Sequence, residues 1–192
     1  MRVGYRPDLA GLSCWGRIDM AGSGWPVLPD AAAQRLIDLP KRVAADWRQV
    51  LLNPPIADRQ FRKTRLYLGG EEEAGPVRGE LFLYSRLRKD EEEPRRTYTF
   101  GLGLRDRVGR DYRLLRCNGP SHPHVNKVEG DRLPPVCHVH RITERYQLHL
   151  AHRPKWEGDG FAIISRPYAG PDDALTDLAS LVNIEVEEAL FA

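Results

Sequence analysis

Cysteine is scarce in this chain. Three residues, Cys14, Cys117 and Cys137, are spread over 192 positions. So few and so widely spaced cysteines exclude the dense disulfide framework of a small secreted domain, and they predict a reducing, cytoplasmic setting. A Cys-x-x-Cys pair is also missing, which removes the usual signature of a thiolate zinc site.

Long apolar runs and a strong charge of one sign are lacking as well. The sequence has neither a run long enough to span a bilayer nor a secretory signal, so we expect an intracellular protein without a membrane partner. Lys and Arg number 29 and Asp and Glu 27, for a net charge of +2. This balance gives no overall attraction to nucleic acid, although a local basic face remains compatible with it. The 41% of apolar residues and the length of 192 residues predict one globular domain.

Helical patterns occur at both ends of the chain. We predict an irregular lead-in over 1–28 and a helical pair over 29–52, interrupted at Pro40, because Pro ends or kinks a helix. A C-terminal helix is predicted over 171–191, since Pro171 suits a first turn and an apolar stripe at helical spacing follows.

The middle of the chain, residues 58–166, alternates apolar and polar residues in short runs separated by polar turns. These runs predict strands over 61–68, 80–87, 96–104, 111–117, 136–142 and 160–165. Consecutive strands joined by short loops are usually antiparallel neighbours. The fold class predicted is therefore α+β, with a mostly antiparallel sheet of five or six strands packed by the N-terminal helical pair and the C-terminal helix.

Four of the six histidines lie within 22 residues. His122 and His124 belong to the glycine- and proline-rich stretch "GPSHPHVNKVEG", which predicts a loop, and His138 and His140 belong to the strand "VCHVHRI". Side chains two apart on a strand share a face, with Cα atoms about 7 Å apart. We therefore expect the loop and strand histidines to form one site. If the strand continues, Glu144 and Tyr146 share that face and Arg141 takes the other.

One interpretation of this site is metal-free cleavage of a phosphodiester. One histidine would take the proton of a 2′-hydroxyl, a second would protonate the leaving oxygen, and a cation or phenol would stabilise the added charge. His138 and His140 are the acid–base candidates, with His122 or His124 as the loop partner. Lys127, Arg141 and Tyr146 are the candidates for charge stabilisation. In this interpretation no cofactor is needed, and RNA is the favoured substrate of a toxin-like or defence-related bacterial ribonuclease.

A second interpretation is one divalent metal ion on His138, His140 and Glu144, a set that suits Fe(II), Mn, Ni or Zn. At these positions alone, the spacing resembles the first metal motif of cupin barrels. A third interpretation is a surface that binds a nucleic acid or a protein partner without chemistry, or a structural polar network.

Arg113 and Arg116 lie on the strand that leads into the histidine loop, so we predict that they bind substrate together with Asn126 of that loop. The stretches "RCNGPSHPHVNKVEG", "HVHRITERY" and "LVNIEVEEAL" resemble a poorly characterised family of small bacterial proteins. That family pairs a Gly-x-x-His-x-Asn-like loop with a His-x-His strand and ends in a helix containing Asn-Ile. The resemblance covers the second half of the chain and implies no particular reaction.

Overall fold

The structure is a computed structural model that describes residues 25–55, 57–89, 97–150 and 160–186. Its helices are α1 (Asp30–Asp38), α2 (Trp47–Leu52), α3 (Glu144–Leu150) and α4 (Pro171–Leu181). Its strands are β1 (Lys41–Val43), β2 (Phe61–Tyr67), β3 (Glu72–Ala74), β4 (Val77–Arg88), β5 (Tyr98–Asp106), β6 (Asp111–Asn118), β7 (His124–Val125), β8 (Arg132–Leu133), β9 (His138–Arg141), β10 (Phe161–Ile164) and β11 (Ile184–Val186). Most of the predicted lead-in and the last residues of the predicted C-terminal helix lie outside the described residues.

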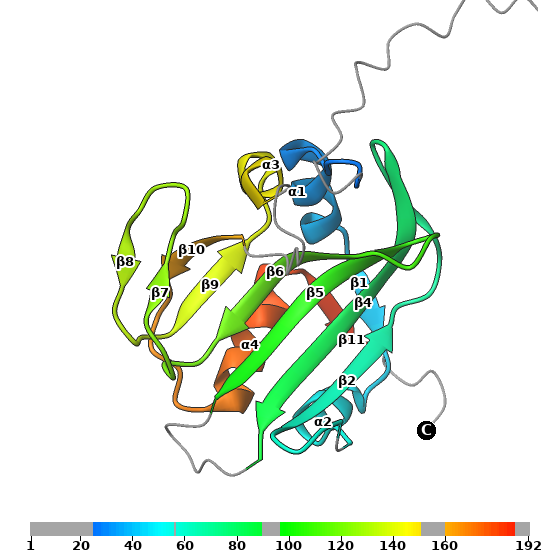
Figure 1. Ribbon diagram of the computed structural model, residues 1–192. Helices are drawn as coiled ribbons and strands as arrows, with labels where there is room; N and C mark the ends of the chain where they lie inside the picture. Colours follow the sequence, from blue (N-terminus) through cyan, green and yellow to red (C-terminus); the bar gives the residue numbers. More distant parts are fainter. Residues whose placement is uncertain (1–24, 56, 90–96, 151–159, 187–192) are drawn as a thin grey trace, which may run out of the picture.

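A large antiparallel sheet dominates the molecule. Six strands form a path in the order β10-β9-β6-β5-β4-β2, and the short β3 adds a seventh by pairing with β4. Each neighbouring pair in this sheet is antiparallel. Two small sheets, β1-β11 and β7-β8, complete the fold (Figure 1). The predicted α+β class with a mostly antiparallel sheet is confirmed.

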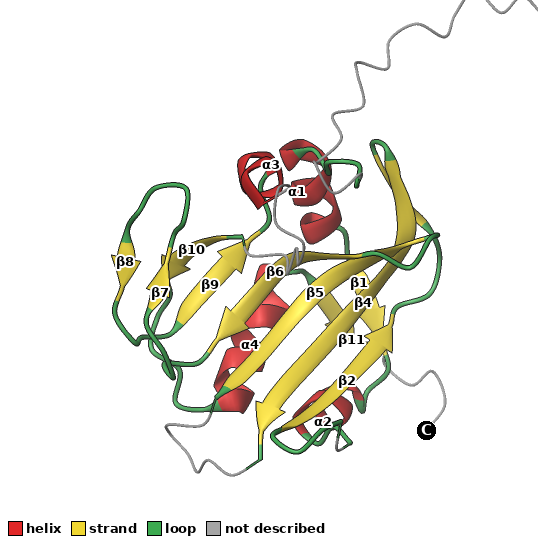
Figure 2. Cartoon of the chain, in the orientation of Figure 1, coloured by secondary structure: helices red, strands yellow, loops and turns green. Residues whose placement is uncertain are grey.

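The helices cover one face of this sheet. Figure 2 shows α4 behind β5 and β6, with α2 near β2 and with α1 and α3 along the upper edge. The buried core lies between the sheet and these helices, with Leu83, Leu102 and Leu115 from the strands and Leu36 and Leu175 from the helices. We call the opposite face of the sheet the open face, because among the described helices none lies in front of β2, β4, β5 and β6.

Alternation along β4 shows how the sequence sets up the two faces. Leu81, Leu83 and Leu87 are buried toward the helices, whereas Phe82 and Tyr84 belong to the open face. Successive side chains of a strand point to opposite faces, so alternate positions of β4 face the core, all apolar or glycine except the buried Ser85, and the intervening positions line the open face.

A bulge in β6 changes this alternation. The pairing of β5 with β6 shifts between Leu102 and Gly103, so that Leu114 is left without an opposite residue. In a regular strand Arg113 and Arg116, three positions apart, would point to opposite faces. The extra residue brings both guanidinium groups to the open face, next to each other across the bulge.

The structure differs from the predicted helices at two places. Residues 41–43, predicted as part of the helical pair, form strand β1, which pairs in parallel with β11. Helix α4 ends at Leu181 because Asn183 adopts φ 55°, in the left-handed region that terminates helices. Residues 184–186, predicted as helix, therefore form β11.

The histidine strand does not continue to Tyr146. β9 ends at Arg141, and α3 begins at Glu144. The hydroxyl oxygen of Thr143 accepts a hydrogen bond from the amide of Tyr146, which favours a helix start. The carboxylate of Asp30 also accepts from the amide of Glu144, and that of Glu144 from the amide of Asp30. These two reciprocal bonds fix the start of α3 against the start of α1.

Candidate histidine site and the adjoining basic groove

Strand β9 places His138 and His140 side by side on the open face. In the register, His140 lies opposite Arg116 of β6, and His138 lies opposite Asn118. The two imidazole centroids are 5.0 Å apart, and both residues are almost fully buried. The predicted pairing of these two histidines on one face is present.

The loop between β6 and β9 folds over this pair. The side-chain amide of Asn126 donates to the carbonyl of Ala162 and accepts from the amide of Ala162, both at 2.9 Å. Asn126 thus forms, with the outer edge of β10, the pair of hydrogen bonds that a neighbouring strand would form. Gly130, at φ 81°, makes the tight turn between β7 and β8.

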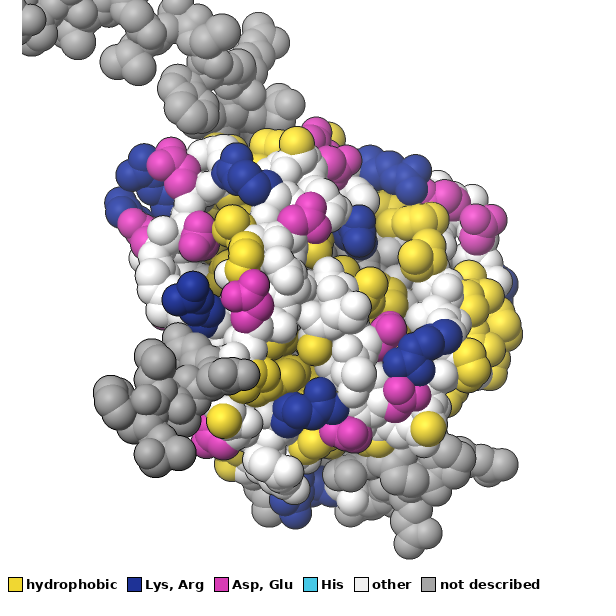
Figure 3. Space-filling view, turned by 180° about the vertical axis from the view of Figure 1, so that it is seen from behind, with side chains coloured by type: hydrophobic (Ala, Val, Ile, Leu, Met, Phe, Trp, Pro, Cys, Tyr) yellow, Lys and Arg dark blue, Asp and Glu magenta, His cyan; other side chains and the backbone are white. Residues whose placement is uncertain are grey.

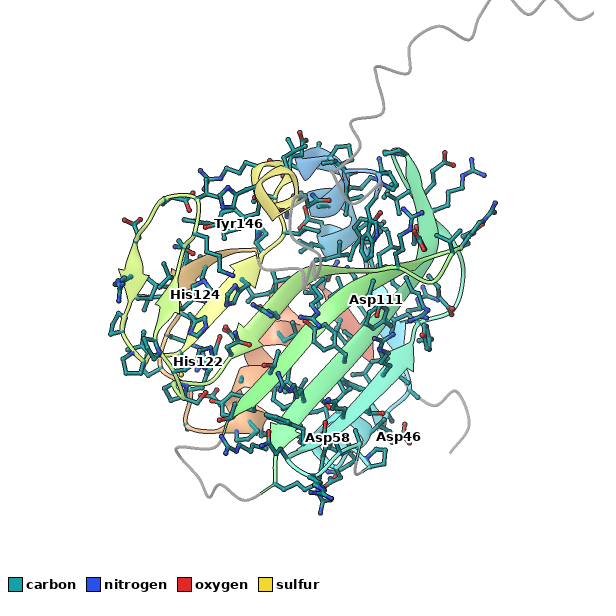
Figure 4. All side chains as sticks on the ribbon, in the orientation of Figure 1. Asp46, Asp58, Asp111, His122, His124 and Tyr146 are labelled. Atoms are coloured by element: carbon teal, nitrogen blue, oxygen red, sulfur yellow. The ribbon has the colours of Figure 1, made fainter. Side chains whose placement is uncertain are left out.

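The fixed loop brings His124 against the strand histidines. Its ring lies 4.4 Å from that of His140 and 5.5 Å from that of His138, between centroids. His122 contacts His138 edge-on at 5.6 Å and is itself exposed. We call His122, His124, His138 and His140 the histidine cluster. Figure 4 labels its two loop members, which lie beside β9.

Hydrogen bonds to backbone carbonyls fix the tautomers of the strand histidines. Nδ1 of His138 lies 2.7 Å from the carbonyl oxygen of Val136, and Nδ1 of His140 lies 3.2 Å from that of Gly160. A carbonyl oxygen only accepts, so each Nδ1 carries the hydrogen. In the neutral ring, Nε2 then holds a lone pair. Asn118 Nδ2 lies 3.2 Å from Nε2 of His138. Nη2 of Arg116 lies 3.4 Å from Nε2 of His140 and 3.3 Å from its Nδ1, so this guanidinium lies against the ring and not at one nitrogen alone.

The imidazoles of His122, His138 and His140 are held neutral. Burial lowers the pKa of His138 and of His140 below the ordinary value, and the positive charge of Arg116 lowers both further. Burial and the charges of Arg116 and Arg86 also lower the pKa of His122. At neutral pH these rings therefore offer lone pairs, and they are poor proton donors.

A basic groove runs from the cluster across the open face. One cavity of about 390 Å³ is lined by Arg86, Thr97, Thr99, Arg116, Asn118, His122, Pro123, His124, Val125 and Lys127. A second cavity, of about 570 Å³, is lined by Lys63, Thr64, Arg65, Phe82, Tyr84, Ser85, Arg86, Thr99, Asp111, Arg113 and Arg116. Arg86, Thr99 and Arg116 line both cavities, so we describe them together as the basic groove.

The groove combines cations with aromatic rings. Among the described residues, six Lys and Arg line it together with a single carboxylate, that of Asp111. The guanidinium of Arg65 pairs with Asp111 and lies 4.9 Å from the centre of the Phe82 ring. On the back of the molecule, in contrast, acidic and basic side chains are interspersed (Figure 3).

Two glycines of β5 make room for these rings. A Cβ on Gly103 would lie 2.4 Å from the Phe82 ring, and one on Gly101 would lie 2.5 Å from the Tyr84 ring. Both rings therefore extend over β5 where any other residue would collide with them. The stretch "GLGL" shapes the floor of the basic groove.

The structure brings some predicted site residues together and separates others. His122, His124, Arg116 and Lys127 share one cavity, and Arg113 lies further along the groove. His138 and His140 are buried against the loop histidines and do not line the cavity themselves. Arg141 lies on the other face of β9, with Val139, and its guanidinium donates to Gln34. Asn126 is buried and bonded to β10, which corrects its predicted role as a substrate ligand to one of positioning.

Glu144 and Tyr146 also take part in contacts outside the cluster. The Glu144 carboxylate accepts a hydrogen bond from the amide of Asp30. The three side chains close enough to share a metal ion are His124, His138 and His140, so His124 takes the position predicted for Glu144. The hydroxyl of Tyr146 donates to Glu129, at 2.5 Å, and Arg145 pairs with the same carboxylate. These bonds hold the β7-β8 loop against α3.

Several residues of the basic groove were not predicted from the sequence. Asn118 contacts His138, and Lys63, Arg65 and Tyr84 line the groove from β2 and β4. The available signal was the alternation of β4, whose charged residues fall on the face opposite the core, whereas β2 carries polar residues on both faces. Only the order in which the strands pair in the sheet places these residues next to the histidines.

Comparisons with protein-family models, with curated proteins and with solved structures find no match. The family resemblance of the second half of the chain therefore stays a prediction. Within the described residues, no helix has the length and apolar character needed to cross a membrane.

Proposed function

We propose that the basic groove binds the backbone of a phosphodiester, with single-stranded RNA as the favoured ligand, and that the protein acts on it at the histidine cluster. The observation that carries this proposal is the continuity of the site. Arg86 and Arg116 line both cavities, so a chain of phosphates lying along the guanidinium groups reaches the histidines. Cationic grooves with aromatic rings are typical of proteins that bind single strands.

The charge and shape of the groove support this ligand class. Arg113 and Arg116 come to the same face through the β6 bulge, and Lys127 adds a cation on the loop side. At the far end, Tyr67 is 43% exposed and its ring lies 5.8 Å from that of Phe82, so a base can stack on it. Guanidinium groups bind phosphate oxygens through paired N–H donors.

RNA is favoured over DNA because its 2′-hydroxyl can react within the chain. A base at the histidine cluster takes the proton of the 2′-hydroxyl, the 2′-oxygen bonds to phosphorus, and the bond from phosphorus to the 5′-oxygen breaks. The leaving 5′-oxygen takes a proton from solvent, which gives a 2′,3′-cyclic phosphate and a 5′-hydroxyl. The lowered pKa of His138 and His140 opposes the acid role predicted for one of them, and it also makes these buried rings weak bases. We therefore assign the base step to His122, which is exposed and lines the cavity.

The charge-stabilising role falls to different residues than predicted. Arg116 and Lys127 lie in the cavity of the cluster, whereas Arg141 and Tyr146 do not line it. We also propose a reducing intracellular setting, which the two buried free thiols of Cys117 and Cys137 support.

Fluorescence anisotropy with a labelled single-stranded RNA tests the proposal. We expect the dissociation constant to rise with salt, because each displaced counterion contributes a slope of about 0.7 for single strands. Arg86→Gln and Arg113→Gln should each weaken binding about tenfold, since each removes one phosphate contact. Arg78→Gln is the matched control, because Arg78 is an exposed arginine of β4 that pairs with Glu73 and lies outside the groove linings.

The same RNA, analysed on a gel, reports on cleavage. We expect products ending in a cyclic phosphate from RNA and none from DNA of the same sequence. The proposed groove would be contradicted by a dissociation constant that does not change with salt concentration, or by one that changes equally in the groove variants and in Arg78→Gln.

A further inference from the structure

We propose that His124, His138 and His140 together bind one divalent transition-metal ion of the zinc class. One ring nitrogen of each lies within 4.8 Å of the other two, and no other group of three possible ligands is found among the described residues. His138 and His140 are buried, and His124 is half-buried. This inference rests on the proposed function only in that the ion would face phosphate in the groove.

The hydrogen bonds of the strand histidines are those of metal ligands. A ligating histidine usually donates its other ring N–H to a carbonyl or a carboxylate, which fixes the ring and directs the remaining lone pair at the ion. His138 donates to the carbonyl of Val136, and His140 to that of Gly160. Both rings therefore present Nε2 with a lone pair, as an ion requires.

The distances allow the three nitrogens to converge. Tetrahedral zinc, with bonds of about 2.0–2.1 Å to nitrogen, holds its ligand nitrogens roughly 3.3 Å apart. The separations of up to 4.8 Å must therefore shorten by about 1.5 Å at most. Rotation of the half-buried His124 side chain toward the two strand histidines can supply part of this change without movement of the fixed loop.

Asn118 offers a further polar group at the same place. Its Oδ1 is buried and lacks a hydrogen-bond partner within the described residues, while its Nδ2 faces Nε2 of His138. If the amide turns by half a rotation, Oδ1 faces the histidines instead. There it can ligate the ion or accept a hydrogen bond from bound water. An ion therefore explains both an unsatisfied oxygen and the close approach of three imidazoles.

The ligand types select the class of ion. Imidazoles without thiolates or carboxylates favour zinc, cobalt, nickel or copper over magnesium or calcium. Three neutral ligands also leave the full charge of the ion available to a phosphate oxygen. Arg116 opposes binding, because its positive charge lies beside Nε2 of His140. Removal of that charge should therefore tighten the binding of the ion.

Titration of the chelator-treated full-length protein with Co²⁺ tests this site without RNA. We expect ligand-field absorption that saturates at one ion per chain and disappears on addition of Zn²⁺. His124→Ala, His138→Ala and His140→Ala should each lower the affinity by about 100-fold or more, beyond the 10–100-fold typical of groups around the ligands. His149→Ala and His122→Ala are controls, because His149 is an exposed residue of α3 and His122 is outside the ligand set.

Arg116→Gln separates a metal ligand set from a merely structural cluster. Loss of the guanidinium charge should raise the Co²⁺ affinity about tenfold or more while it weakens RNA binding. A protein that shows no cobalt absorption, or whose absorption survives in the folded His138→Ala and His140→Ala variants, would overturn the inference. Failure of RNA binding with intact cobalt binding would instead overturn the proposed function.

Discussion

Asn126 shows how much of the site depends on one side chain that contacts no ligand. Its amide bonds both backbone groups of Ala162 and so holds the loop on the outer edge of β10. His124, two residues earlier in the chain, reaches the strand histidines only because of that attachment. A polar residue inside a conspicuous histidine loop is easily assigned to substrate, and only the contacts of Asn126 identify it as a positioning residue.

Asn126→Ala should therefore affect both stability and the site. Two buried hydrogen bonds are lost and the backbone of Ala162 is left without these partners, so the free energy of unfolding should fall by about 2–3 kcal/mol. Urea denaturation measures this change. Co²⁺ affinity should fall at the same time because His124 is released, whereas Ser121→Ala, in the exposed part of the same loop, should change neither quantity. Full stability in Asn126→Ala would contradict the positioning role.

At the scale of the element, β5 and β6 together create the basic groove. The bulge at Leu114 turns Arg113 and Arg116 to one face, and the glycines of β5 let the rings of Phe82 and Tyr84 extend over the sheet. Neither strand is a simple alternating ladder at these points. Departures from regularity thus shape the open face, while the regular alternation of β4 builds the core.

The two β5 glycines should differ in how they tolerate a methyl group. In Gly101→Ala the new Cβ would lie 2.6 Å from the backbone carbonyl oxygen of Leu115, which the sheet holds in place. In Gly103→Ala the close contacts are with the Phe82 ring, a side chain that can shift. Overpacking costs typically about 1–3 kcal/mol, and we expect Gly101→Ala to be the more destabilising. Equal melting temperatures of the two variants and the parent protein would contradict the described packing.

At the scale of the whole molecule, much of the architecture follows from the sequence. Alternation predicted the strands that became β2, β4, β5, β6, β9 and β10, and Asp30 with the residues after it predicted α1. The start of α3 was missed because it depends on reciprocal bonds between Glu144 and Asp30, more than a hundred residues apart. The β1-β11 pair was missed for the same reason, since the sequence gives no register between distant segments.

The candidate site was predictable in part. Two histidines on one face of a strand follow from local geometry, and the loop histidines joined them as expected. Glu144, the predicted carboxylate ligand, does not join them, because strand β9 ends before it. Arg113 and Arg116 came to one face through a bulge that no local pattern in β6 indicates, so their joint contribution to the groove could be found only in three dimensions.

Photo-cross-linking of the protein to a single-stranded RNA that carries 4-thiouridine tests the central claim most directly. Mass spectrometry of the cross-linked peptides locates the RNA on the surface. We predict cross-links in the peptides that contain Tyr67, Tyr84 and residues 119–127, which border the basic groove and the histidine cluster. Cross-links confined to α4 and the exposed side of β10, on the helix-covered face, would contradict the account.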